Sequence, residues 1–346
     1  MLYAVIMAGG IGSRFWPMSR NSSPKQTLPL LSEKPMMRET IDRLKGFIPT
    51  HQILVSTRKD MEKTIKKIVP DHELIVEPLG KNTGPSIGLI TEKLFARDKD
   101  AVIITLPSDH YIEGNGNFLE DLRIAAKEAE KDKIVTIGIT PTRASTALGY
   151  IEKGNSLTGK VFSVKRFVEK PPLEKAIDFV ESGNFVWNAG MFIFKASKMR
   201  EELRTHAPKL FEGLERIKDS GFDGAVALKE FAAMEKIQID YAVMEKSRDL
   251  VMVEAGFGWE DIADFAAIGV FLKKDRDGNA VKGNFLGLNA RDNIVYSKKL
   301  VAGIDIKDLI IVETEDAILV CPKQSSQKTK ELIEFMQKDK KYGKYL

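Results

Sequence analysis

Short apolar runs alternate with segments of helical periodicity along the first two-thirds of the chain. The apolar runs read LYAVIM, QILVST, ELIVEP, AVIITLPSDH and KIVTIGI, and an amphipathic segment separates each from the next. Apolar runs that do not alternate with polar residues indicate strands buried on both faces. The pattern therefore predicts an α/β fold in which helices flank an open, mostly parallel sheet.

The pattern changes after about residue 270. Short apolar pieces are then interrupted every few residues by Gly, Asn or Asp, which predicts short strands in a compact, left-handed β-helix-like unit. The segment SSQKTKELIEFMQKDKK predicts a closing helix with a serine at its N-cap. We place the boundary between a Rossmann-like domain of residues 1–270 and a β-rich domain of residues 271–346.

Composition and charge narrow the classes of function. Lys and Arg total 53 against 49 Asp and Glu, with the signs interspersed, which argues against a dedicated nucleic-acid binder. The single cysteine, Cys321, cannot form an internal disulfide, and no apolar run approaches the roughly 20 residues of a membrane span. We therefore expect a cytoplasmic protein that binds neither nucleic acid nor membrane.

Glycines and cations follow the first strand directly. Gly9, Gly10 and Gly12 stand within four residues, and Arg14 and Lys25 come shortly after them. Backbone N–H groups exposed by glycines beside cations form a site for phosphate. Because open α/β sheets bind ligands beyond the carboxyl ends of their strands, this loop should share one cleft with residues 107–110.

The loop differs from two common phosphate-binding motifs. The dinucleotide pattern G-x-G-x-x-G fails because Phe15 occupies the third glycine position, which argues against an NAD-dependent dehydrogenase. The P-loop pattern is absent, because no Gly-Lys pair precedes a Ser or Thr in this segment. The sequence therefore indicates a phosphate loop of another kind.

The string GGIGSRFWPMSRNSSPKQ resembles the signature of the sugar-phosphate nucleotidyltransferases, and within them that of the mannose-1-phosphate guanylyltransferases. Three further strings agree in order and spacing: NTGPS at Asn82, FVEKP at Phe167 and WNAGMF at Trp187. The resemblance covers about residues 1–270, with a weaker likeness over the tail. It implies a reaction in which GTP and mannose 1-phosphate give GDP-mannose and pyrophosphate.

Two cations are suited to this reaction, in which an anionic phosphate must attack another anionic phosphate in line. Charge cancellation and alignment then supply most of the catalysis. Arg14 is suited to hold the β- and γ-phosphates and Lys25 the α-phosphate, so we predict both as catalytic residues. His110 is given no role as a base, because a phosphate monoester is already ionised at neutral pH.

The nucleotide is expected on the glycine loop and the loop after the third strand, the latter by resemblance. The predicted nucleotide-binding residues are Ala8, Gly9, Gly10, Gly12, Ser13, Asn82, Thr83, Pro85, Ser108 and Asp109. Asn82 or Thr83 could instead, or as well, cap a helix. Gly84, which departs from the pattern of the family, is expected to loosen the base loop.

The sugar phosphate is expected at Gly149, Glu169, Lys170 and Asn188. A carboxylate and a carboxamide suit sugar hydroxyls, Lys170 suits the sugar's phosphate, and Gly149 by resemblance lets the backbone approach. Because neighbours in a strand point to opposite faces, either Glu169 or Lys170 could instead be a surface residue.

Asp109 and Asp261 are the predicted ligands of a Mg²⁺ ion. Mg²⁺ takes one or two carboxylates together with phosphate oxygens and water, and these two positions hold the metal in the family that the chain resembles. Asp264 and Glu260 are rival ligands, and a helix N-cap is the alternative role for Asp261.

Two other functions stay open at this point. One is uridylyl or thymidylyl transfer to glucose 1-phosphate or another sugar phosphate, and the other is a non-catalytic relative that binds nucleotide sugars and regulates a partner. Only about 75 residues follow the predicted boundary, so we expect no fused phosphomannose isomerase domain and a single activity. The β-rich tail is a candidate contact for a homodimer.

Overall fold

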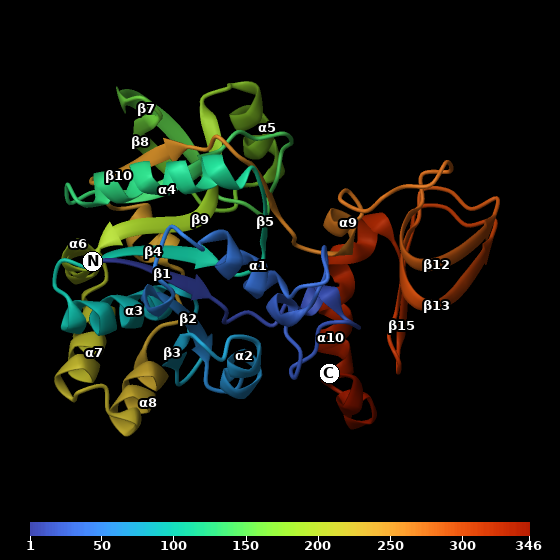
Figure 1. Cartoon of the computed structure of the whole chain (residues 1–346), viewed down its shortest axis with the longest axis horizontal. Coiled ribbons are helices and arrows are strands. Elements are labelled where there is room, and N and C mark those ends of the chain that lie inside the picture. Colours follow the sequence, from blue (N-terminus) through green and yellow to red (C-terminus); the bar gives the residue numbers. More distant parts are fainter.

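A nine-stranded sheet forms the centre of the large domain in the computed structural model, which describes residues 1–346 (Figure 1). The strand order is β3-β2-β1-β4-β9-β6-β10-β8-β7. The bounds are β1 (Leu2–Met7), β2 (Ile53–Arg58), β3 (Glu73–Glu77), β4 (Val102–Pro107), β6 (Ile134–Ile139), β7 (Tyr150–Thr158), β8 (Val161–Val168), β9 (Phe185–Lys195) and β10 (Leu250–Glu254).

The predicted open, mostly parallel sheet is confirmed, and its exceptions are local. β3, β2, β1 and β4 are parallel neighbours, and so are β6 and β10. β9 runs antiparallel between β4 and β6, so those two strands point the same way, and β8 runs antiparallel to β10. The sheet is therefore mixed, and the carboxyl ends of β1 to β4 and of β6 lie at one edge.

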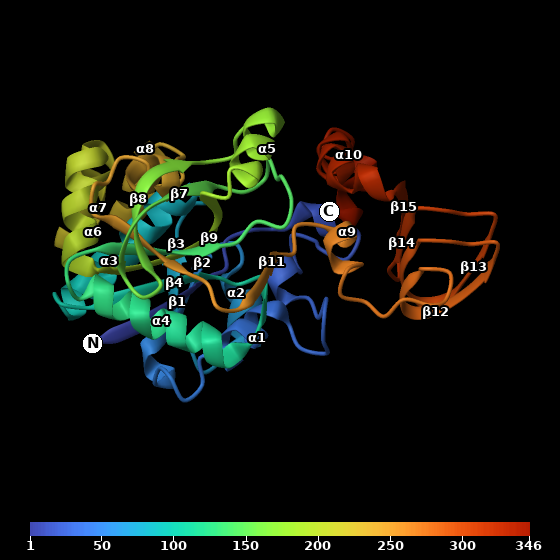
Figure 2. The same cartoon turned by 90° about the horizontal axis from the view of Figure 1, so that it is seen from above.

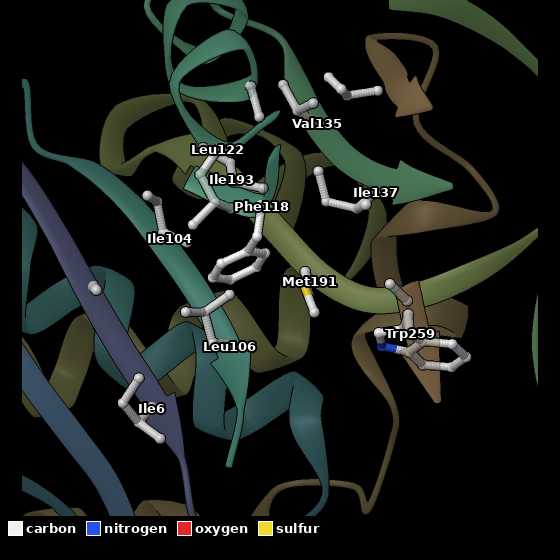
Figure 3. Close-up of a cluster of buried hydrophobic side chains, with 14 of the residues drawn as sticks. Ile6, Ile104, Leu106, Phe118, Leu122, Val135, Ile137, Met191, Ile193 and Trp259 are labelled. Carbon is white, nitrogen blue, oxygen red and sulfur yellow. The ribbon is translucent and has the colours of Figure 1, made fainter. Parts of the chain in front are cut away.

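Helices cover both faces of this sheet. One face carries α1 (Met36–Arg43), α2 (Glu62–Ile68), α4 (Asn115–Ala129) and α5 (Leu173–Glu181). The other carries α3 (Thr83–Arg97), α6 (Ala196–His206), α7 (Pro208–Asp219), α8 (Gly224–Ala233) and a π-helical turn over Asp240–Met244. Alternate side chains of a strand point to opposite faces, so each face has its own core. Figure 3 shows Phe118 of α4 directed at Leu106 and Met191 in one of them.

The C-terminal domain is a short stack of coils. β12 (Ala280–Leu288), β13 (Ile294–Ile304) and β14 (Leu309–Glu313) are parallel neighbours, and β15 (Ile318–Pro322) closes the stack antiparallel to β14. Ile294 pairs with Ala280 on one side and with Ile310 on the other, so the chain completes one coil between successive strands. The predicted β-rich, β-helix-like unit is confirmed.

The predicted closing helix is also confirmed, although its cap differs. A 3₁₀ segment (Lys323–Lys328) leads into α10 (Thr329–Met336), and Figures 1 and 2 both show α10 next to the coils of β12–β15. The predicted serine N-cap is wrong, because Lys328 stands at that position without a side-chain bond. Ser326 instead donates a hydrogen bond to Asp264 Oδ2 at 2.9 Å, which ties the helix to the end of the large domain.

A third buried cluster joins the glycine-loop region to the C-terminal domain. Its members come from the loop after β1, from the short helix α9 (Phe265–Ile268), from the coils and from α10; they include Phe15, Trp16, Leu30, Phe265, Ile310, Val312 and Met336. Trp16 Nε1 also donates to the Tyr345 carbonyl at 2.8 Å, and Arg20 pairs with Asp316 at 2.8 Å. The C-terminal domain therefore packs against the loop that carries the glycines.

No helix in the structure combines the length and the apolar character needed to cross a bilayer.

Ile310→Ala should lower the free energy of unfolding by about 2–4 kcal/mol, because it removes a fully buried side chain from the cluster that joins the domains. Urea unfolding followed by tryptophan fluorescence measures this, since Trp16 lies in the same cluster. Ile318→Ala is the matched control: Ile318 is 63% exposed, so we expect a change within about 0.5 kcal/mol. Equal losses in the two variants would contradict the shared core.

Candidate active site

The glycine loop turns tightly so that Lys25 returns to the end of β1. Gly12 has a φ of +73°, and a Cβ atom added there would lie 2.2 Å from the Cβ of Lys25. Only glycine fits this position. The Lys25 N–H donates to the Ile11 carbonyl at 3.0 Å, and Ser19 Oγ donates to the Gly12 carbonyl at 2.7 Å. These bonds hold Lys25 in place.

Lys25 bridges the two aspartates that the sequence predicts as metal ligands. Its Nζ lies 2.8 Å from Asp109 Oδ2 and 4.0 Å from Asp261 Oδ1, and its side chain is only 6% exposed. Burial by itself would raise the pKa of Asp109, but the charge and hydrogen bond of the neighbouring Lys25 oppose burial, and the pKa lies below its ordinary value. The predicted proximity of the loop and residues 107–110 is thus observed.

A two-stranded sheet brings Asp261 to this position. β11 (Gly258–Asp261) pairs antiparallel with β5 (His110–Glu113), and the register sets Asp261 opposite His110, next to Asp109 in the chain. Trp259 Nε1 donates to His110 Nδ1 at 3.1 Å, and burial lowers the pKa of His110. A neutral His110 that accepts this bond fixes β11 beside the end of β4.

The two rival acidic residues are occupied elsewhere. Asp264 caps α9, with Oδ1 accepting from the Ala267 N–H at 3.1 Å, while its Oδ2 accepts the bond from Ser326. Glu260 pairs with Arg143. Of the three candidates between residues 260 and 264, only Asp261 therefore reaches the cluster formed by Lys25 and Asp109.

Arg14 follows the glycines of this loop and has no partner of its own. It stands in a 3₁₀ turn (Ser13–Phe15), is half-buried, and makes no hydrogen bond or ion pair with the protein. Phe15 packs under Lys25, whose Nζ lies 5.1 Å from the ring centre. The arginine is therefore the unpaired cation of the loop, and Lys25 is the paired one. Ser108, also predicted, is buried directly after β4.

A cavity of about 360 Å³ opens on the other side of the glycine loop, at the ends of β1, β2 and β3. Four of the predicted nucleotide-binding residues line it: Gly9, Gly10, Asn82 and Thr83. The sequence analysis missed Met7, Arg58, Glu77, Gly80, Ser86 and Lys236, which line it as well. Glu77 follows the same strand-end rule that found Asp109 and could have been identified by it.

Three further predicted nucleotide residues, Ala8, Ser13 and Pro85, do not line this cavity. The Ala8 carbonyl accepts from Gln26 Nε2 at 3.0 Å and from Thr57 Oγ1 at 3.1 Å, which anchors the end of β1. Pro85 is buried in the first turn of α3, and neither it nor Ser13 lines the cavity. The end of β1 beside the cavity is therefore held by side-chain hydrogen bonds.

The loop before α3 is fixed by the segment that precedes the π-helical turn. Asn82 occupies the N-cap position with a φ of +75° and makes no side-chain bond to the helix, while Thr83 Oγ1 accepts from the Ile239 N–H at 2.9 Å. The Gly84 N–H donates to the Ile237 carbonyl at 2.9 Å, and an added Cβ would lie 2.8 Å from that oxygen. The expectation that Gly84 loosens the loop is therefore wrong, because the glycine permits this close contact.

The residues predicted for the sugar phosphate form a second cluster. A Cβ added at Gly149 would lie 2.5 Å from Glu169 Oε2 and 3.4 Å from the Cβ of Asn188, so the glycine lies against both side chains. Tyr150 pairs with both β8 and β9, which brings their ends together. Lys170 pairs with Glu169 and is partly exposed.

Asp240, which the sequence analysis missed, fixes the side chain of Asn188 by a hydrogen bond. Asn188 Nδ2 donates to Asp240 Oδ1 at 3.2 Å, and its Oδ1 accepts from Thr136 Oγ1 at 2.8 Å. Burial, and then the charge of Glu169, raise the pKa of Asp240 to about 7. Asp240 lies in the π-helical turn, a feature that no local sequence pattern marks.

The two clusters are connected through β9. The Gly190 N–H donates to Asn188 Oδ1 at 3.0 Å, and Gly190 lies against Pro107 at the end of β4, two residues before Asp109. A ligand that spans the cavity, the cation cluster and Asn188 would therefore lie along the carboxyl edge of the sheet, where the fold predicts it.

The chain matches known protein families over both of its domains. The Nucleotidyl transferase family model matches residues 3–276, and the model of the MannoseP isomerase/GMP-like beta-helix domain matches residues 283–336. The mannose-1-phosphate guanylyltransferases of Salmonella muenchen and Klebsiella pneumoniae are 37% and 35% identical, over 97% and 99% of this chain and 73% and 75% of their own lengths.

A solved structure extends the similarity to the whole fold. The crystal structure of a Thermus thermophilus protein named mannose-1-phosphate geranyltransferase matches with a TM-score of 0.89 and 31% identity, over 97% of this chain and 99% of that one. The chain therefore belongs to the nucleotidyl transferase family, among the mannose-1-phosphate guanylyltransferases.

Proposed function

We propose that this chain transfers GMP from GTP to mannose 1-phosphate, giving GDP-mannose and pyrophosphate. The observation that carries the proposal is the buried Lys25, which bridges Asp109 and Asp261 and belongs to the same glycine loop as the unpaired Arg14. A nucleotide-sized cavity adjoins this cluster through the glycine loop, and a group of carboxylate and carboxamide side chains adjoins it through β9. The family to which the chain belongs supports the same reaction.

The cations act where charge must be neutralised. A phosphate oxygen of mannose 1-phosphate forms a bond to the α-phosphorus, the bond from that phosphorus to the β-phosphate oxygen breaks, and its electrons leave with pyrophosphate. Lys25 is placed to stabilise the α-phosphate, and Arg14 to hold the β- and γ-phosphates with its planar fork. No residue forms a covalent intermediate, and no base is required.

Asp109 and Asp261 are suited to hold a Mg²⁺ ion. Both are oxygen donors, and they already share one cation, the Lys25 ammonium group. No group of three or more His, Cys, Asp or Glu side chains stands ready to hold a metal anywhere in the chain. Two carboxylates with phosphate oxygens and water match the way Mg²⁺ binds at phosphate-transfer sites. When bound, the ion neutralises phosphate charge at the reacting centre.

The sugar is placed by the second cluster. Asn188 has its carboxamide fixed by Thr136 and Asp240, and Glu169 lies against Gly149 with Lys170 as its partner. Glu169 and Asn188 accept from and donate to sugar hydroxyls, and Lys170 binds the sugar's phosphate. We assign the chemistry to the domain of residues 1–270 and the support of the glycine loop to residues 271–346. Because GTP is made and kept inside cells, we place the enzyme in the cytoplasm.

Lys25→Met should reduce turnover about 100-fold to 1000-fold and change the KM for GTP much less, because the cation is needed most where charge develops during transfer. Pyrophosphate release is measured with mannose 1-phosphate and each of GTP, ATP, UTP and dTTP. Lys34→Met, on an exposed lysine that pairs with Asp42, should leave turnover unchanged. If GDP-mannose is not the product, the proposed function is wrong. If Lys25→Met keeps full turnover, the role given to Lys25 is wrong.

Asp261→Asn should raise the Mg²⁺ concentration needed for half-maximal turnover and lower the maximum, because one of two carboxylate ligands is lost. A Mg²⁺ titration of the purified variant measures both. Asp264→Asn, three residues away, should keep normal metal dependence, since Asn retains a capping oxygen for α9. Normal metal dependence in Asp261→Asn with a defect in Asp264→Asn would reverse the assignment.

We also propose that a second copy of this chain covers an apolar strip on the C-terminal domain. Leu286, Leu288, Leu300 and Ile304 are 64–67% exposed, and the β12–β13 register with strand alternation puts all four on one face. A strip of this kind is unusual on a monomer and is self-complementary across a two-fold axis.

The double variant Leu288→Asp/Ile304→Asp should convert a homodimer to a monomer, because it places carboxylates opposite each other in the interface. Sedimentation velocity at micromolar concentration measures the mass. The double variant Lys298→Asp/Lys299→Asp changes charge on the same strand outside the strip and should stay dimeric. A monomeric unmodified protein, or a dimer that survives both changes, would refute the interface.

A further inference from the structure

Arg143 lies in the loop of residues 140–148, which leads from β6 to Gly149, and neither the sequence analysis nor the transfer chemistry uses it. Its guanidinium group binds Glu260 of β11 with two hydrogen bonds: Nη1 donates to Glu260 Oε2 at 3.1 Å, and Nη2 donates to Glu260 Oε1. Glu260 directly precedes Asp261, the predicted metal ligand. One side chain therefore joins the loop of the sugar site to the strand of the metal site.

The same guanidinium group covers the ring of Trp187. Its central carbon lies 5.2 Å from the ring centre. Trp187 is 1% exposed and directly precedes Asn188, the predicted sugar-binding carboxamide. An isolated exposed ion pair contributes little to stability, but a two-bond fork that also stacks on an aromatic ring is confined to one geometry. Arg143 thus lies where the loop, β9 and β11 meet.

A cavity of about 400 Å³ separates parts of the loop, β9 and β11. Its lining includes Thr142 from the loop, Trp187 from β9 and residues 258–260 from β11. The backbone of β11 pairs on one edge only, with β5. Because Arg143 follows Thr142 in the chain and binds Glu260, its side chain joins two walls of this cavity.

Two cations bind β11 from opposite faces. Neighbouring residues of a strand point to opposite faces, and Glu260 and Asp261 accordingly have different partners. Lys25 Nζ lies 4.0 Å from Asp261 Oδ1, whereas Arg143 binds Glu260. The hydrogen bonds to Glu260, and more weakly the charge of Asp261, raise the pKa of Arg143, so its guanidinium group stays charged. Loss of Arg143 would leave β11 with a cation on the Lys25 face alone.

We infer that Arg143 is a positioning residue that couples the sugar-phosphate site to the metal site by holding Glu260 of β11. This inference rests on the proposed function. The Gly149 carbonyl accepts from the Asn188 N–H at 2.8 Å, so a shift of the loop moves a part of the sugar site. A shift of β11 moves Asp261 in the same way. Loss of Arg143 should therefore weaken the binding of both mannose 1-phosphate and Mg²⁺.

The decisive experiment measures the KM for mannose 1-phosphate and the Mg²⁺ concentration for half-maximal turnover. Arg143→Met should raise both values about 5-fold to 20-fold and change kcat less than about 2-fold, because a positioning contact is lost and no reacting group is. The double variant Arg143→Met/Glu260→Met should be no worse than Arg143→Met, since both side chains act through one contact. Arg143→Lys keeps the charge but loses the fork, so its values should lie between those of Arg143→Met and the unmodified protein.

Arg166→Met is the matched control. Arg166 is 54% exposed, against 52% for Arg143, and pairs with Glu152 at 3.2 Å. Its guanidinium carbon also lies 5.4 Å from the ring centre of Phe179. These partners belong to the β7–β8 hairpin and to α5, so the contact does not reach β11. Arg166→Met should keep the KM for mannose 1-phosphate and the Mg²⁺ requirement within about 2-fold.

The outcomes separate this inference from the proposed function. If the unmodified protein does not turn over GTP with mannose 1-phosphate, the proposed function fails and this inference falls with it. If it does, but Arg143→Met keeps either value or only lowers kcat and the melting temperature, Arg143 does not couple the two sites. Additive effects of Arg143→Met and Glu260→Met also overturn the inference. Should Arg143→Met fail to fold, which its thermal melt reveals, Glu260→Met decides, because it removes the same contact from the other side.

Discussion

The bridge from Lys25 to Asp109 and Asp261 is the interaction on which the rest of the site depends. An ammonium group that is only 6% exposed is stable only beside carboxylates. Its two partners come from the turn after β4 and from β11, far from the glycine loop in the chain. The glycine loop, the end of β4 and β11 must therefore meet at one point. Gly12 leaves room for Lys25, and the pairing of β5 with β11 supplies Asp261.

This requirement also explains why the C-terminal domain packs against the large one. A loop of glycines has little structure of its own, and Phe15, which packs under Lys25, belongs to the cluster that α9, the coils and α10 complete. Asp264 links the two domains. Its Oδ1 caps α9, and its Oδ2 accepts a hydrogen bond from Ser326, which lies just before α10. The coils and α10 thus hold the glycine loop in its observed shape.

Much of this arrangement could be predicted from the sequence, because it follows from local rules. Continuous apolar runs predicted the buried strands, and the carboxyl-edge rule placed the loop beside Asp109. The antiparallel β9 could not be predicted, since direction depends on long-range pairing. The choice between Asp261 and Asp264 needed the register of β11 against β5, and the fit of Gly84 against Ile237 needed a contact between segments far apart in the chain.

Charge balance across the whole site accounts for the two carboxyl groups with raised pKa values. The reacting centre must receive two anionic substrates, yet the site already contains two acidic residues, Asp109 and Asp261. Glu77 at the nucleotide end and Asp240 at the sugar end both have pKa values of about 7, chiefly because they are buried. Near neutral pH each is therefore neutral part of the time, which lowers the cost of burying it. Burial at the two ends thus reduces the negative charge that Glu77 and Asp240 add to the site near neutral pH.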